Sequence, residues 1–195
     1  KENGKVASKK MESVTVLFSD FVDFTRHSEK LDSEELVQSI DYYFSKFDEI
    51  MERHDLEKIK TIGDAYMAAG GMNSSDDHDV LKTVRAALEM QAFITSRKQE
   101  MDALGKHSFE MRIGIHTGPV VAGIVGVKKF QYDIWGDTVN TASRMESAGE
   151  VSKVNISQAT YELLKSDSHF TFESRGKIEV KGKGEMEMWF VQLKS

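Results

Sequence analysis

The chain has 195 residues, a length that suits one domain with a core large enough to need no covalent crosslinks. It contains no Cys, which excludes disulfides and thiolate metal sites, and its formal net charge of −6 argues against a nucleic-acid partner, which would need a basic face. No apolar run approaches the roughly 20 residues of a membrane-spanning helix.

The first residues carry neither an initiator Met nor a signal-peptide pattern. We expect residues 1–10 to be the end of a linker from an upstream regulatory or sensor region. Residues 11–195 are then expected to form the folded domain.

A strand and a helix are predicted first along the chain. Residues 13–20 are rich in β-branched and apolar side chains and end at a carboxylate, Asp20, which predicts a core strand. Residues 33–54 carry apolar side chains at helical spacing, and Ser33 with Glu35 supplies a capped start, which predicts a helix.

A hairpin and a second helix follow. Residues 58–62 and 65–69 are predicted to be two short strands around Gly63 and Asp64, residue types that tolerate a positive φ. Residues 77–101 have the apolar spacing of a second amphipathic helix.

A further hairpin is predicted from residues 109–116 and 120–125, with its turn at residues 117–119, where Gly precedes Pro. The remaining predicted elements are a helix at 137–148, a strand at 154–157, a helix at 158–165 and a closing hairpin at 176–193. Because strands and helices mix without a regular βαβα order, the predicted fold class is α+β with a mostly antiparallel sheet.

Two carboxylates are predicted to meet at one rim of this sheet. Asp20 ends a strand and Asp64 sits in a tight turn, so pairing of the first strand beside that hairpin would bring them together. Hard oxygen ligands near each other suit Mg²⁺, and two metal ions could clamp the attacking and leaving oxygens of a phosphoryl transfer. Taken singly, each Asp is better explained by ordinary turn chemistry than by metal binding.

Five segments, in order and at matching spacing, closely resemble the catalytic domain of class III adenylate and guanylate cyclases. They are residues 18–25, 58–67, 111–118, 131–145 and 180–184. The resemblance runs from about Glu12 to Leu193 and implies a ferredoxin-like βαββαβ core. It also implies a head-to-tail homodimer with active sites at the interface.

The resemblance assigns roles to individual residues. Asp20 and Asp64, with the backbone carbonyl of Phe21, match the ligands of two Mg²⁺ ions, for which Mn²⁺ could substitute. The residues that match substrate positions are Lys60 and Asp133 for the purine, Asn140 and Arg144 for the ribose and the transition state, Arg112 and Lys181 for the triphosphate, and Phe24, Thr25 and Ile134 as further contacts. One residue departs from the pattern, because Asp23 stands where family members commonly carry Gly.

The purine pair favours ATP over GTP. Adenine offers an acceptor at N1 and a donor at N6, which match Lys60 and Asp133, whereas guanine presents the opposite pattern. Guanylate cyclases of this family resemble the mirror choice, with Glu and Cys at these places. The sequence therefore predicts an adenylate cyclase, a lyase that forms cyclic AMP and pyrophosphate.

Two alternatives stay open at this point: a guanylate or dual-specificity cyclase, and a catalytically silent module that binds nucleotide and signals through dimerisation. Because one chain carries every role once, two identical chains would build two complete sites and a monomer would be inactive. A domain that consumes ATP is expected to face the cytosol. His116 is expected to be a hydrogen-bonded core residue rather than a metal ligand.

Overall fold

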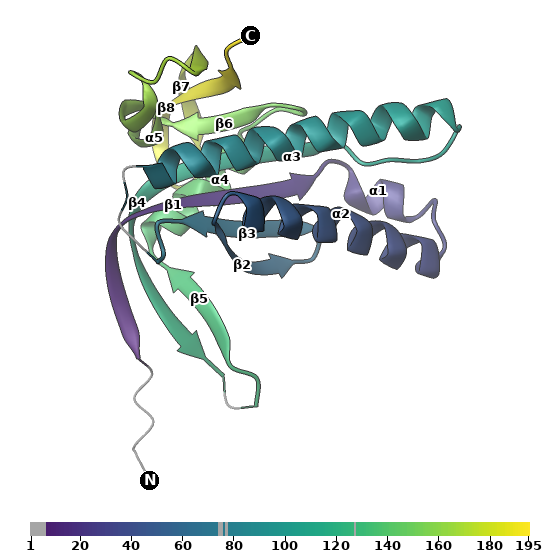
Figure 1. The fold of residues 1–195 in the computed structure, drawn as a ribbon, viewed down its shortest axis with the longest axis horizontal. Coiled ribbons are helices and arrows are strands. Elements are labelled where there is room, and N and C mark those ends of the chain that lie inside the picture. The colour runs from purple at the N-terminus through teal and green to yellow at the C-terminus, as the bar shows by residue number, and fades with distance from the viewer. Residues whose placement is uncertain (1–6, 74–75, 77, 127) are drawn as a thin grey trace.

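One mixed, 8-stranded sheet organises the part of the chain that the structure, a computed structural model, describes: residues 7–73, 76, 78–126 and 128–195 (Figure 1). The strands are β1 (Ser8–Phe21), β2 (Glu57–Ile62), β3 (Ala65–Gly70), β4 (Met111–Val125), β5 (Gln131–Trp135), β6 (Val154–Ser157), β7 (Phe170–Val180) and β8 (Gly184–Leu193). The helices are α1 (Phe24–Ser28), α2 (Ser33–Arg53), α3 (His78–Ala103), α4 (Asp137–Ser147) and α5 (Gln158–Leu164).

The first half of the chain has the expected βαββαβ order, β1-α2-β2-β3-α3-β4. The sheet order is β2-β3-β1-β4-β6-β8-β7, with β5 pairing β4 beside this path, so β1 lies between β3 and β4. Only the β4–β6 pair is parallel among the described strands. The predicted α+β class with a mostly antiparallel sheet is confirmed. None of the described helices is both long and apolar enough to cross a membrane.

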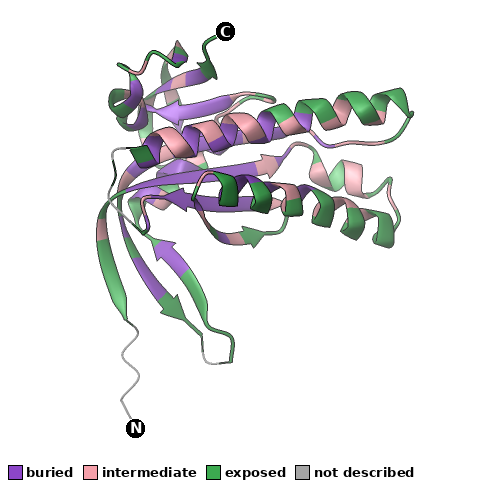
Figure 2. Ribbon diagram, viewed as in Figure 1, coloured by how far each residue is buried: buried purple, intermediate pink, exposed green. Residues whose placement is uncertain are grey.

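Hydrophobic layers form on both faces of the sheet because side chains alternate along β1. Leu17 and Phe21 point to the face that α2 and α3 cover. Val16 and Phe18 point to the opposite face, toward α4. By the same alternation Asp20 lies on the α4 face. Figure 2 shows the inner side of α3 and the central strands buried and the far end of the β4–β5 hairpin exposed.

The predicted hairpin within residues 109–125 is wrong, because β4 runs through this segment without a turn. Pro119 is tolerated inside the strand since β1 has a register shift between Met11 and Val14, directly opposite it. The missing N–H of Pro therefore coincides with a bulge rather than with a regular ladder bond. Gly118 serves close packing against α4 instead of a turn.

Other boundaries also differ from the prediction. Asp32, not Ser33, caps α2, since its carboxylate accepts from the Glu35 amide at 2.8 Å and Glu35 reaches back in a capping box. β1 begins at Ser8, so the last three residues of the predicted linker belong to the sheet, while the origin of that linker stays a prediction. The strand β5 and the helix α1 were not predicted, and β7 begins at Phe170 rather than at residue 176.

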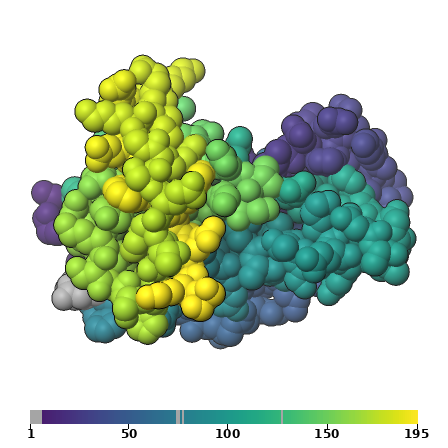
Figure 3. Space-filling view, turned by 90° about the horizontal axis from the view of Figure 1, so that it is seen from above, coloured from purple at the N-terminus to yellow at the C-terminus, as the bar shows by residue number. Residues whose placement is uncertain are grey.

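The C-terminal hairpin formed by β7 and β8 stands out from the body of the molecule (Figure 3). In that view a recess lies between the hairpin and the purple-blue segment that contains α1 and the start of α2. Val180 and Met188 of the hairpin pack against Met145 of α4 in a small separate cluster. The hairpin is therefore attached to α4 as well as to the sheet.

Candidate active site

Asp20 and Asp64 meet at one rim of the sheet, as predicted. Asp20 pairs in register with Ala65, and Asp64 occupies the turn immediately before that residue. The two carboxyl groups lie close enough that Asp20 raises the pKa of Asp64. Antiparallel pairing of β1 with β3 is thus what joins two residues 44 positions apart (64 − 20).

Arg112 and Glu146 complete this corner. Arg112 faces Asp20 across the β1–β4 ladder, and its Nη2 lies 3.6 Å from Glu146 Oε2. Glu146 is buried at 6% exposure although it is charged. Sequence reasoning missed Glu146, yet it falls four residues after the buried Ala142 on the inward stripe of α4, where a carboxylate is out of place.

The acidic cluster of Asp20, Asp64 and Glu146 holds more negative charge than Arg112 neutralises. Burial, a hydrogen bond to Asp20 and the Asp20 charge raise the pKa of Asp64 to about 7. Burial also raises the pKa of Asp20 and of Glu146. Asp20 Oδ1 and Glu146 Oε2 are buried without a hydrogen-bond partner among the described residues. Carboxylate oxygens that lack a hydrogen bond, in a cluster of excess negative charge, fit a divalent cation.

Lys60 and Asp133 form a second group. Lys60 Nζ lies 2.6 Å from Asp133 Oδ2, and the other carboxylate oxygen of Asp133 accepts from the Ile134 amide at 2.8 Å. Asp133 is buried at 6% exposure, and the two residues are 73 positions apart. No hydrogen bond or ion pair joins this pair to the acidic cluster within the described residues.

Close packing of α4 on β4 fixes the helix that carries Asn140 and Arg144. A methyl group added to Gly114 would lie 1.9 Å from the backbone nitrogen of Glu146, and one added to Gly118 would lie 2.5 Å from the Thr138 hydroxyl. Gly114 and Gly118 therefore let the helix backbone approach the strand more closely than any larger residue would.

Three predicted substrate residues present side chains with no partner inside the described chain. Asn140 and Lys181 are exposed and Arg144 is half-buried, and none of these side chains forms a hydrogen bond or ion pair with another described residue. They are available to a molecule outside this chain. The structure does not gather them with the acidic cluster into one enclosed pocket.

The remaining predicted contacts are placed differently. The side chains of Phe24 and Ile134 pack against core clusters, so a substrate could meet only their backbone or a ring edge. Thr25 is exposed on α1. Asp23 has φ 53°, a left-handed conformation that favours Gly and that Asp tolerates, and its side chain is exposed. Gly adopts this backbone geometry without strain, so the geometry is compatible with the Gly that the resemblance leads one to expect there.

His116 is half-buried and, as predicted, hydrogen-bonded. Its Nδ1 lies 2.6 Å from the Ser157 hydroxyl, and burial together with the Lys183 charge lowers the pKa of His116 to about 4. The unfolded chain, with a His pKa near 6.5, binds more protons between pH 6.5 and pH 4. Stability is therefore expected to fall as the pH drops through this window, by at most about 1.4 kcal/mol per pH unit from this residue.

Urea unfolding at pH 7, 6 and 5 measures this slope. His116→Asn should unfold with a shallower loss of stability toward acid than the wild type. An identical slope in the two proteins would show that His116 titrates normally.

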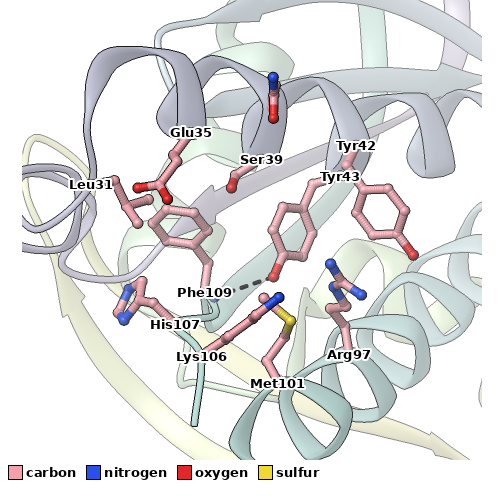
Figure 4. A pocket seen from close by; sticks show the side chains of 11 residues that line it. Leu31, Glu35, Ser39, Tyr42, Tyr43, Arg97, Met101, Lys106, His107 and Phe109 are labelled. Carbon is pink, nitrogen blue, oxygen red and sulfur yellow. Dashed lines mark hydrogen bonds between the residues drawn. The ribbon is translucent and has the colours of Figure 1, made fainter. Parts of the chain in front are cut away.

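A pocket lies elsewhere in the described chain. It has a volume of about 390 Å³ and lies between α2 and the C-terminal part of α3, where Tyr43, Arg97 and His107 line it (Figure 4). The Tyr43 hydroxyl accepts from the Phe109 amide at 3.4 Å beside it. None of the predicted site residues lines this pocket.

Comparison with known proteins decides the family. The model of the family described as "Adenylate and Guanylate cyclase catalytic domain" matches residues 6–193. The chain belongs to this family. The cyclase domain is 43% identical over 191 residues to guanylate cyclase soluble subunit beta-2 of Rattus norvegicus, and 40% identical over 186 residues to an adenylate cyclase of Mycobacterium bovis. These matches cover 98% and 95% of this chain but only 27% and 41% of the two relatives.

The fold agrees with a solved cyclase. The crystal structure of the adenylyl cyclase CyaB from P. aeruginosa superposes with a TM-score of 0.89 at 30% identity, covering 97% of each chain. The resemblance stated from the sequence is thus confirmed. Because relatives of the cyclase domain include both adenylate and guanylate cyclases, membership of the family leaves the choice of purine open.

Proposed function

We propose that this cyclase domain converts ATP to 3′,5′-cyclic AMP and pyrophosphate, with divalent metal ions, preferably Mg²⁺, at Asp20 and Asp64. The observation that carries the choice of ATP is the contact of 2.6 Å between Lys60 and the buried Asp133. This pair offers a donor and an acceptor side by side at one place. Without a bound nucleotide, the Lys60 ammonium group donates a hydrogen bond to the Asp133 carboxylate, so both groups have a partner.

An adenine base would exchange this contact for two matched hydrogen bonds. Lys60 would donate to N1, and Asp133 would accept from N6. Guanine would set its N1–H against the ammonium group and its O6 against the carboxylate, leaving both protein groups unpaired. An unpaired buried polar group costs about 1–3 kcal/mol, so two of them disfavour GTP by roughly 30-fold or more.

The other residues supply position and charge. Bound metal ions would activate the ribose 3′-hydroxyl and neutralise charge on the departing pyrophosphate. Arg112 and Lys181 would hold the triphosphate, Asn140 the ribose, and Arg144 would donate to the oxygens around the reacting phosphorus. The assignment of metal ions to Asp20 and Asp64 is supported by the excess negative charge of the acidic cluster.

Within one chain the acidic cluster and the Lys60–Asp133 pair are separate. A homodimer with shared active sites accounts for this separation, because each site would combine the cluster of one protomer with the pair of its partner. Asp20, Asp64 and Arg112 would come from one protomer. Its partner would supply Lys60, Asp133, Asn140, Arg144 and Lys181. The β4–β5 hairpin supports this arrangement because it exposes large apolar side chains, among them Phe130 at 79%, Ile124 at 46% and Trp135 at 40% exposure. Apolar surface of this kind marks protein interaction sites. We infer further that an upstream regulatory domain controls the dimer and that the catalytic domain works in the cytosol.

Turnover of both nucleotides tests the proposed specificity. With Mg²⁺ and separately with Mn²⁺, the wild type is expected to have a kcat/KM for ATP at least about 30-fold above that for GTP. Lys60→Glu combined with Asp133→Cys should lose this preference. Lys58→Glu is the matched control, since Lys58 lies on the same strand and pairs with Asp48 at 3.0 Å. Equal turnover of GTP and ATP by the wild type would refute the assignment of ATP, and no cyclic nucleotide at all would favour the silent module.

A further inference from the structure

An ion pair connects the tip of the C-terminal hairpin to the first residue of α4. Lys183, in the turn between β7 and β8, contacts Asp137 through its ammonium group. The Lys183 side chain is 22% exposed and that of Asp137 is 76% exposed. Neither residue belongs to the set that the sequence resemblance assigned to substrate or metal.

The turn that carries Lys183 also carries Lys181. Gly182 and Gly184, which flank Lys183, have φ 77° and 75°, conformations that few other residues adopt. The Lys183 amide donates to the Val180 carbonyl at 3.0 Å and closes the turn. Lys181 is exposed and pairs with no described residue. Within the described residues, Lys183 is therefore held by an ion pair and Lys181 is not.

The hairpin is held to α4 at two places. Beside the turn and along β8, Val180 and Met188 share a small hydrophobic cluster with Met145, near the C-terminal end of the helix. At its tip, Lys183 contacts Asp137 at the N-terminal end. Asp137 and Met145 are eight residues apart on α4, about 12 Å along the helix axis, so the two attachments are separate. The hydrophobic contact holds the hairpin against α4, and the ion pair sets the orientation of the turn between β7 and β8.

We propose that the Asp137–Lys183 pair is a positioning device that orients the β7–β8 turn so that Lys181 reaches the triphosphate. This inference rests on the proposed function, specifically on the role of Lys181. The pair places Lys181 in one rigid unit with Asn140 and Arg144, since all three then move with α4. An exposed ion pair adds little to folding stability, so its effect is expected on substrate binding.

Steady-state kinetics with Mg²⁺-ATP tests the pair. Lys183→Gln and Asp137→Asn should each raise KM about fivefold, equivalent to about 1 kcal/mol, with kcat changed less than twofold. The double variant should be no worse than either single one, because each already breaks the same contact. Lys183→Arg should stay near the wild type. Lys177→Gln is the matched control, since Lys177 on β7 is exposed and forms no ion pair with the described residues.

A second comparison tests whether Lys183 acts through Lys181. In a Lys181→Ala background, Lys183→Gln should change KM less than twofold. If Lys183 instead bound the triphosphate itself, Asp137→Asn would leave KM unchanged and the Lys181 and Lys183 substitutions would multiply. Either result would overturn the inference.

Failure of the inference can be told from failure of the proposed function. Suppose that the wild type makes cyclic AMP and Lys181→Ala raises KM, but that Lys183→Gln and Asp137→Asn both leave KM unchanged. Then only the positioning role of the Asp137–Lys183 pair is wrong. If Lys181→Ala is itself silent, the role of Lys181 in the proposed function falls, and the inference falls with it. Thermal unfolding of each variant, expected within about 2 °C of the wild type, excludes misfolding as the cause.

Discussion

Asp64→Ala is expected to lower cyclase turnover by at least about 10³-fold, because one of two neighbouring carboxylates in the acidic cluster is removed and metal binding contributes several kcal/mol to such reactions. Asn140→Ala should be similarly poor in isolation. When the two inactive proteins are mixed in equal amounts, activity should return to about a quarter of the wild-type value. Random pairing makes half of the dimers mixed, and each mixed dimer has one intact site out of two.

The fraction of cyclase activity that returns on mixing distinguishes active sites shared between two chains from active sites contained within one chain. Cyclic AMP formation is measured in the mixture and in each variant alone at the same total protein concentration. A mixture of Asp64→Ala with Asp20→Ala is the control and should recover nothing, because both substitutions damage the same half of the site. Recovery in that control, or none in the first mixture, would contradict the two-chain arrangement.

Gly114→Ala is expected to cost about 100-fold in kcat/KM and to lower the melting temperature by about 5 °C. The added methyl group would lie 1.9 Å from the Glu146 nitrogen and 2.3 Å from the Met145 carbonyl carbon, both backbone atoms of α4. Backbone atoms cannot move aside by a change of rotamer as a side chain can, so the helix itself must shift. A displacement of about 1 Å in the helix carrying Asn140 and Arg144 is enough to impair catalysis.

Gly118→Ala provides a matched control for this effect. Its added methyl group meets the Thr138 side chain at 2.5 Å rather than backbone, so Thr138→Ala in the same protein should restore both stability and activity. No side-chain substitution should rescue Gly114→Ala. Wild-type activity in Gly114→Ala would show that the close approach of α4 to β4 is not required.

Local chemistry in the sequence was enough to predict most of the core. Apolar spacing predicted α2 and α3, and the runs around Gly63 and Asp64 predicted the β2–β3 hairpin, because these elements follow from periodicity and turn residues. The order of five motifs predicted the family. The prediction failed at Pro119, where a proline suggested a turn although a bulge in the neighbouring strand accommodates it.

The candidate site was predictable in its parts but not in its full membership. The sequence suggested Asp20 and Asp64 because each is a carboxylate at the end of a strand or in a turn. Glu146 was missed: its place on the inward stripe of α4 marks it as unusual, but only the packing of α4 on β4 shows that it lies beside Arg112. The sequence did not suggest the contact between Asp137 and Lys183, which are 46 positions apart.

The sequence by itself therefore determined the chemical inventory: the family, the kinds of groups present and the donor–acceptor character of Lys60 and Asp133. Tertiary structure decided which of these groups meet. Long-range contacts depend on strand register and on how closely elements pack, and these are properties of the whole sheet rather than of a window of residues. Pairing of Asp20 with Ala65, and the absence of a side chain at Gly114, set the geometry of the acidic cluster and of α4.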